Sequence, residues 1–136
     1  MAPHIHRVSV YYEDTDFSGL VYHANYLKYF ERAREHLLGR EALVRLWRDD
    51  GLGFVVYRAD IQYREGARFG DELEIRTVAS LKSEFRAVFD QSVWRADGKR
   101  AMVEAEIHLV CVDKDNKLVR LPSRVIEYAR RAAEEA

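Results

Sequence analysis

The residues best suited to chemistry gather in one short segment near the start of the chain. Residues 10–26 carry three acids, a histidine and several aromatic side chains, and they precede a stretch with helical periodicity. Free N–H groups and a partial positive charge at a helix N-terminus can stabilise an oxyanion, and a nearby acid can act as base or nucleophile. The same composition is also typical of an acidic turn that only caps a helix, so both interpretations stay open.

Hydrophobic periodicity predicts the elements that position this segment. Partial alternation indicates a strand over residues 5–12. A period near 3.6 predicts a helix over 24–38, ended by Gly39 and followed by a short helix over 41–49. From Phe54 onward the period changes to two, which predicts further strands before a last helix. These later elements span residues 53–64, 71–81, 83–95, 100–112 and 124–134.

The order of these elements predicts an α+β domain. The Asp97-Gly98 pair is typical of a tight hairpin, and consecutive hairpins give a largely antiparallel sheet with helices on one face. A chain of 136 residues has room for one domain, covering 1–136. Alternating residues on the second face of the sheet would stay partly exposed. Phe89, Val93 and Ile107 would then supply apolar material for self-association.

Composition and charge narrow the function classes. A net charge of -1 provides no overall basic field to hold nucleic acid or an anionic membrane. No stretch approaches the roughly 20 apolar residues that span a bilayer, and the first residues lack an apolar signal core, so we expect a cytoplasmic protein.

Cys111 is the only cysteine and lies in an apolar alternating run, which predicts a buried side chain rather than a nucleophile. His4 and His6 alternate without further ligands at metal-site spacing, so no zinc site is expected.

The acidic segment and the helix after it resemble the signature of the 4-hydroxybenzoyl-CoA thioesterase family, in particular its YbgC-type acyl-CoA thioesterases, which are associated with the Tol-Pal system. That signature runs from a Tyr-Tyr-Glu-Asp-Thr-Asp motif through a glycine and Val-Tyr-His to a helix with Phe-Glu-Arg-Ala-Arg. The matching residues here are Tyr11 to Asp16, Gly19, Val21 to His23, Asn25, Tyr26 and Phe30 to Arg34. A match of this length is far more specific than a short motif.

The resemblance implies a fold, an activity and an assembly. The fold is the hotdog, in which an antiparallel sheet of about five strands wraps around a long central helix. The activity is hydrolysis of acyl-CoA to free acid and coenzyme A, without a metal or redox cofactor. A homodimer or homotetramer places the active sites between subunits, and the YbgC resemblance adds a membrane-associated protein partner as a further expectation.

The resemblance also assigns roles within the segment. Asp16 matches the family's catalytic aspartate, which either attacks the thioester carbonyl or activates water to do so. His23 matches the position whose backbone N–H donates to the oxyanion, with Gly19 shaping the turn before it. The His23 imidazole is a second catalytic candidate, with helix capping as the alternative.

Neighbouring residues have two interpretations each. Asp14 is a second acid or, more simply, a hydrogen-bond acceptor that holds the loop. Glu13 and Asn25 have the same structural interpretation, and Asn25 is also a candidate for substrate binding. Tyr12 and Tyr22 either pack or line the acyl pocket.

Charged residues beyond the acidic segment have expected roles that depend on the element that carries them. The matched helix carries Glu31, Arg32 and Arg34, which are expected to form a solvated face with local ion pairs. Coenzyme A carries phosphates, so basic residues in or beside strand connections are candidates for binding them. The candidates are Lys82, Arg86, Arg64 and Arg68.

Two rival functions use the same residues. A hotdog hydratase or dehydratase would share the fold, but its site resembles an Asp followed by a His five residues later, whereas Asp16 and His23 are seven apart. A non-catalytic acyl-CoA-binding module would keep the pocket without turnover. Such a module is expected to lack the catalytic acid, which this chain retains as Asp16.

Overall fold

Alternating apolar residues build one antiparallel sheet, as a computed structural model of residues 2–134 shows. The strands lie in the order β1-β3-β4-β5-β2, and a short β6 pairs with β5. Strand β2 therefore forms one edge of the main path and β1 the other. The strand bounds are His4–Ser9 (β1), Gly53–Tyr63 (β2), Glu72–Leu81 (β3), Ala87–Arg95 (β4), Val103–Val112 (β5) and Leu118–Val119 (β6).

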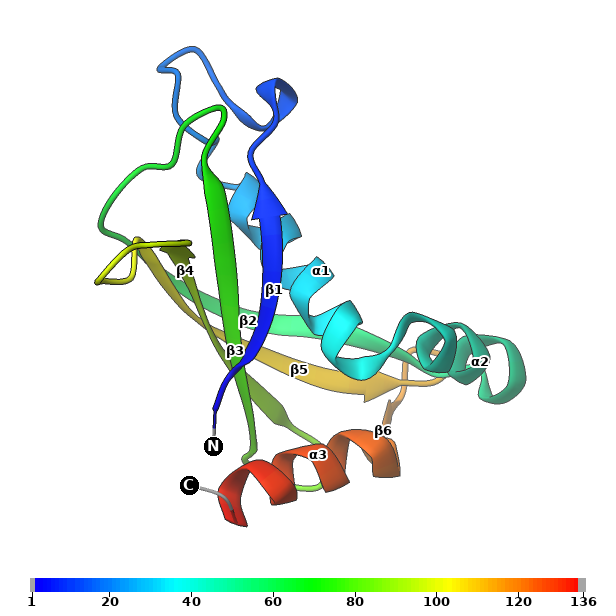
Figure 1. Ribbon diagram of the computed structural model, residues 1–136. Helices are drawn as coiled ribbons and strands as arrows, with labels where there is room; N and C mark the ends of the chain where they lie inside the picture. The colour runs from blue at the N-terminus through cyan, green and yellow to red at the C-terminus, as the bar shows by residue number, and fades with distance from the viewer. Residues whose placement is uncertain (1, 135–136) are drawn as a thin grey trace.

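Three helices accompany the sheet. Helix α1 (Asn25–Leu38) lies along one face, α2 (Arg40–Asp50) follows it directly, and α3 (Ser123–Glu134) packs near the far end of β3 (Figure 1). Gly39 separates the first two helices with a φ of 95°, which a residue with a Cβ rarely adopts. The predicted helices over 24–38, 41–49 and 124–134 are confirmed to within one residue at each end.

The expectation that apolar residues on the second sheet face drive self-association is wrong for the three residues named. Phe89, Val93 and Ile107 are at most 1% exposed and belong to the core, together with Phe30 and Ala33 of α1. Their alternation does mark one face of the sheet, but it is the face that α1 already covers. Side-chain period alone cannot say which face a helix occupies.

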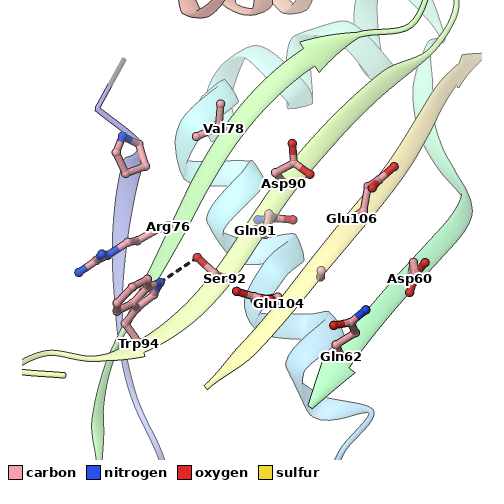
Figure 2. A pocket seen from close by; sticks show the side chains of 12 residues that line it. Asp60, Gln62, Arg76, Val78, Asp90, Gln91, Ser92, Trp94, Glu104 and Glu106 are labelled. Carbon is pink, nitrogen blue, oxygen red and sulfur yellow. Dashed lines mark hydrogen bonds between the residues drawn. The ribbon is translucent and has the colours of Figure 1, made fainter. Parts of the chain in front are cut away.

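The opposite face of the sheet is polar. Figure 2 shows carboxylates from three neighbouring strands on it, where a shallow pocket of about 550 Å³ is also lined by Trp94. Asp60 on β2 and Asp90 on β4 both pair with Glu106 on β5, so three acids lie in one row across the strands. Like charges directly opposite each other destabilise a sheet, which leaves this face better suited to water than to a dry apolar contact.

A buried polar network joins α1 to the sheet. Arg34 is only 8% exposed, and its Nη1 donates to Gln91 Oε1 on β4 over 3.0 Å. Gln91 Nε2 in turn donates to the Phe30 carbonyl over 3.1 Å and to Thr77 Oγ1 over 3.0 Å. The predicted solvated position of Arg34 is therefore wrong, because Arg34 lies one helical turn after Phe30 and shares its sheet-facing side.

Three predicted strands are shorter than expected, and the one predicted over 100–112 begins at Val103. The strand predicted over 5–12 ends at Ser9, because the chain enters a 3-10 turn, η1 (Tyr12–Asp14), that Asp14 holds through the Tyr11 N–H. The strand predicted over 83–95 begins at Ala87, because the residues before it form the turn from β3. Local side-chain to backbone hydrogen bonds compete with the sheet ladder after Ser9 and before Ala87.

Cys111 is buried, as its place in an apolar alternating run predicted. The Cys111 side chain is buried on β5 and forms no disulfide, and burial raises the pKa of its thiol. Such a thiol is a packing group rather than a nucleophile. Within residues 2–134, no helix combines the length and apolar character needed to cross a membrane.

Two histidines stack where β1 meets the end of α1. The rings of His6 and His36 lie 4.2 Å apart between centroids, with an angle of 22° between their planes. Burial first, and then the His36 charge, lowers the pKa of both His4 and His6, with His4 and Arg32 adding to the effect on His6. His4 and His6 therefore lose their protons more readily in the folded protein than in the unfolded chain.

Acidification through pH 6.5 should destabilise the fold through this stack. His4 and His6 bind protons more readily in the unfolded chain, so the stability they contribute is present above 6.5 and declines as pH falls toward their folded pKa values. The unfolding free energy, measured in urea, should fall between about pH 7.5 and 5.5.

The variant His6→Phe keeps a ring in the stack without its charge and should flatten this slope. Ile5→Phe, at the exposed neighbouring position, is the matched control and should keep the slope of the wild type. An equal slope in the wild type and in His6→Phe would contradict the account.

Candidate functional site

The loop before α1 is held by a buried acid. Asp14 Oδ2 accepts the Tyr11 N–H over 2.8 Å, and Oδ1 accepts the Asn25 side-chain amide over 3.0 Å. The Asp14 carbonyl also accepts the Tyr22 N–H over 2.9 Å. One residue thus joins both ends of the loop to the first turn of α1, which is the loop-holding role expected for Asp14 and Asn25.

Asp16 lies two residues further along, in a tight turn on the surface. Its N–H donates to the Leu20 carbonyl over 2.9 Å, its carbonyl accepts the Gly19 N–H over 3.0 Å, and Gly19 has a φ of 83°. Asp16 Oδ1 accepts the Ser18 hydroxyl over 2.5 Å and the Ser18 N–H over 2.8 Å. Within residues 2–134, Oδ2 accepts no hydrogen bond, so one carboxylate oxygen is anchored and the other is open.

The surroundings of Asp16 favour its ionised form. The Ser18 hydroxyl and then the Ser18 N–H lower the pKa of Asp16 below its ordinary value of 3.8, and the nearby His23 lowers it further. These effects outweigh the small desolvation, since the carboxyl group is fully exposed. Asp16 is consequently a carboxylate at neutral pH.

The chain around His23 is held on both sides. The Tyr22 carbonyl accepts the Asn25 N–H over 2.8 Å, and the His23 carbonyl accepts the Tyr63 hydroxyl over 2.8 Å. The His23 N–H itself has no acceptor within residues 2–134. It is one of the free donors just before the start of α1, where the helix dipole is positive.

A pocket of about 340 Å³ brings these groups together. Asp16 and His23 both line it, together with Tyr63 from β2 and Tyr26 from α1. The pocket therefore combines an ionised carboxylate with a free amide at a helix N-terminus, which is an arrangement suited to attack on a carbonyl group.

Comparison with known proteins identifies the family. The sequence pattern of the thioesterase-like superfamily matches residues 10–129, which include both Asp16 and His23. The chain belongs to this family. An acyl-CoA thioester hydrolase YbgC from Escherichia coli O6:H1 is 39% identical over 111 residues, covering 78% of this chain and 79% of that protein. A putative esterase from Aquifex aeolicus is 32% identical over 126 residues, covering 92% and 96% of the two chains.

Solved structures confirm the fold. A hypothetical protein from Aquifex aeolicus superposes with a TM-score of 0.82 at 30% identity, covering 93% of this chain and 99% of that one. A 1,4-dihydroxy-2-naphthoyl-CoA thioesterase from Synechocystis gives a TM-score of 0.84 at 24% identity, covering 93% and 94%. The predicted α+β hotdog fold, the YbgC-type family and the class of thioester hydrolase are therefore confirmed.

The two aromatic candidates of this thioesterase lie beside the pocket rather than in its lining. Tyr22 is 47% exposed, and its ring lies 4.5 Å from the His23 ring between centroids. Tyr12 is 78% exposed and contacts Phe69 at 5.8 Å. Both rings are too open to be ordinary core residues of a single chain.

The basic candidates divide into two groups. Arg64 lines the pocket, and Arg68 pairs across a β-bridge with Leu20 of the Asp16 turn. Lys82 and Arg86 instead bracket the β3–β4 turn, which contacts the segment before α3 through the Glu84 carbonyl. Figure 1 places that end of the sheet opposite the loop before α1, so one chain does not bring Lys82 and Arg86 to Asp16.

Sequence reasoning missed two residues of the site. Ser18 supplies both hydrogen bonds to Asp16, and a serine two residues after an aspartate is a local signal that could have found it. Tyr63 reaches His23 from 40 residues away, and nothing in the alternation of β2 marks it. Among residues 2–134, no group of three or more His, Cys, Asp or Glu is placed to hold a metal ion.

The Ser18 hydroxyl should control the ionisation of Asp16. Ser18→Ala removes the largest cause of the lowered pKa, so the Asp16 pKa is expected to rise toward 3.8. A ¹³C NMR titration of the aspartate carboxyl groups measures this change. Ser9→Ala removes a hydroxyl that binds Glu72 instead and should leave the Asp16 titration unchanged. An unaltered Asp16 pKa in Ser18→Ala would refute the assignment.

Proposed function

We propose that this thioesterase hydrolyses acyl-CoA to a free acid and coenzyme A, with Asp16 as the catalytic carboxylate. The observation that carries the proposal is one pocket lined by both Asp16, whose Oδ2 accepts no hydrogen bond within residues 2–134, and His23, whose N–H has no acceptor there. The YbgC relatives, named as acyl-CoA thioester hydrolases or thioesterases, support the choice of substrate class.

Two routes use the same carboxylate. In the first, Asp16 attacks the thioester carbonyl carbon, the C–S bond breaks and coenzyme A leaves as a thiolate. Water then opens the resulting mixed anhydride to the free acid and restores the carboxylate. In the second, Asp16 accepts a proton from a water molecule that attacks the same carbon, the C–S bond then breaks, and the proton passes from Asp16 to the departing coenzyme A thiolate. Both routes require ionised Asp16, which its lowered pKa supplies.

Both routes also place negative charge on the carbonyl oxygen as the tetrahedral intermediate forms. We propose that the His23 N–H donates to that oxygen, supported by the positive end of the α1 dipole. His23 lines the same pocket, and its imidazole is proposed to orient the substrate or the water there. This donor is already in place before the reaction begins. It binds the charged oxygen of the transition state more strongly than the neutral carbonyl of the substrate, so it lowers the activation barrier.

The phosphates of coenzyme A require cations near the mouth of the pocket. Arg68 is exposed beside the Asp16 turn, and within residues 2–134 its guanidinium has no ion-pair partner. Arg64 is already paired with Glu104 at 2.9 Å. Arg68 is therefore the better candidate on the same chain, and Lys82 or Arg86 could reach coenzyme A only from a second subunit.

A second subunit is proposed on separate grounds. Strand β2 is an edge strand of eleven residues, and most of its side chains are exposed, including Val55, Val56 and Tyr57. A long exposed edge with apolar side chains offers free backbone donors and acceptors to another strand. We propose that two copies pair along β2 in a homodimer or a larger homo-oligomer.

The enzyme hypothesis is tested by removing the charge of Asp16. Asp16→Asn should lower kcat by at least about 100-fold, because the amide is neither a nucleophile nor a base. Thiol release from butyryl-CoA, palmitoyl-CoA and benzoyl-CoA measures turnover. Asp60→Asn, which removes an exposed carboxylate on the opposite sheet face, is the control and should match the wild type.

The outcomes separate the candidate functions. Turnover of no substrate by the wild type, with retained binding of coenzyme A, would favour the acyl-CoA-binding module. Addition of water to an enoyl-CoA without thiol release would favour the hydratase. Near-normal hydrolysis by Asp16→Asn would reject the role of Asp16 while leaving the activity intact.

The assembly is tested by charging the edge strand. Val56→Lys should shift the protein toward monomer in sedimentation velocity, because two lysines on paired β2 strands repel each other and lose apolar contact. Val44→Lys on α2 is the matched control, since Val44 and Val56 are 45% and 44% exposed. A wild-type protein that sediments as a monomer at micromolar concentration would reject the proposed dimer.

A further inference from the structure

The His23 N–H lies between two fixed carbonyl groups. A backbone N–H points in a direction set by the dihedral angles on either side of its peptide, and those angles are fixed when both flanking carbonyls are held. The Tyr22 carbonyl shares a peptide unit with the His23 N–H and is held by the Asn25 N–H over 2.8 Å. This first restraint comes from the helix start itself.

The second restraint comes from a distant part of the chain. Tyr63 is the last residue of β2, and its hydroxyl donates to the His23 carbonyl over 2.8 Å. Its ring lies 6.4 Å from the His23 ring and 5.9 Å from the Tyr26 ring between centroids. The Tyr26 hydroxyl is itself fixed, because it accepts the Ala67 N–H over 3.1 Å.

The same backbone residue anchors the chain before His23. The Val21 N–H donates to the Ala67 carbonyl over 2.8 Å. Two hydrogen bonds therefore hold residues 21–23 in place. One joins Val21 to Ala67, and the other joins His23 to Tyr63 on β2. Burial raises the pKa of the Tyr63 phenol, so the hydroxyl stays protonated and remains a donor across the working pH range.

We propose that Tyr63 is a positioning residue of the thioesterase reaction, whose hydroxyl holds the His23 peptide so that its N–H points at the carbonyl oxygen of the substrate. The proposal rests on the proposed function, because it needs an oxyanion that forms at His23. Tyr63 acts through the backbone of His23 and takes no proton in the reaction.

This role has a distinct kinetic signature. A donor held in place before the reaction stabilises the charge that develops in the transition state, and it contributes little to binding of the neutral ground state. Loss of the Tyr63 hydroxyl should therefore lower kcat and leave KM unchanged. A residue that bound the substrate directly would raise KM instead.

The test is Tyr63→Phe, which keeps the ring and removes only the hydroxyl. We expect kcat to fall by about 10-fold with KM within twofold of the wild type. Tyr128→Phe is the control, because it also removes only a hydroxyl, and Tyr128 lies on α3, the helix at the end of the sheet opposite the loop before α1 (Figure 1). That variant should keep the wild-type kcat and KM.

A spectroscopic measurement separates this inference from the proposed function. In ¹H–¹⁵N NMR spectra of ¹⁵N-histidine-labelled protein, the His23 amide resonance should shift in Tyr63→Phe and not in Tyr128→Phe. An unmoved resonance, a kcat within twofold of the wild type, or a rise in KM alone would each overturn the positioning role. If the wild type releases no thiol and Asp16→Asn behaves identically, the proposed function fails instead, while the amide shift still reports whether Tyr63 holds His23.

Discussion

The burial of α1 against one face of the sheet is the constraint on which the rest of the structure depends. Apolar contact alone would let a helix slide or rotate on a flat apolar surface. The Arg34 and Gln91 side chains remove that freedom, because their buried donors and acceptors are paired only in one register, through Thr77 and the Phe30 carbonyl. A shift of α1 would leave these buried polar groups unpaired, which would destabilise the fold.

A fixed α1 has a fixed N-terminus, and the residues of the candidate site lie in the loop just before it. Asp14 and Asp16 show how two similar acids take opposite roles two residues apart. Asp14 is buried and its carboxylate is used by the Tyr11 N–H and the Asn25 amide, so it holds the backbone. Asp16 is exposed and anchored through one oxygen, which leaves the other free for chemistry.

The sequence predicted what depends on local pattern. Strand and helix order, the α1 bounds and the acidic loop all follow from periodicity and turn chemistry, and the match from Tyr11 to Arg34 supplied the family. Predictions from the sequence were wrong where the burial of a residue depends on how distant elements pack. Phe89, Val93 and Ile107 alternate as a surface-forming set would, yet α1 covers them. Arg34 has the charge of a solvated residue but the helical phase of a buried one.

Long-range contacts are the part of the site that no local pattern could reveal. The hydroxyl of Tyr63, at the end of the edge strand β2, bonds the carbonyl of His23, which lies 40 residues earlier in the chain. In the proposed dimer that edge is also where a second chain pairs. Ordering β2 by pairing would then order the residue at its end, so assembly and the orientation of the His23 amide would be coupled through one strand.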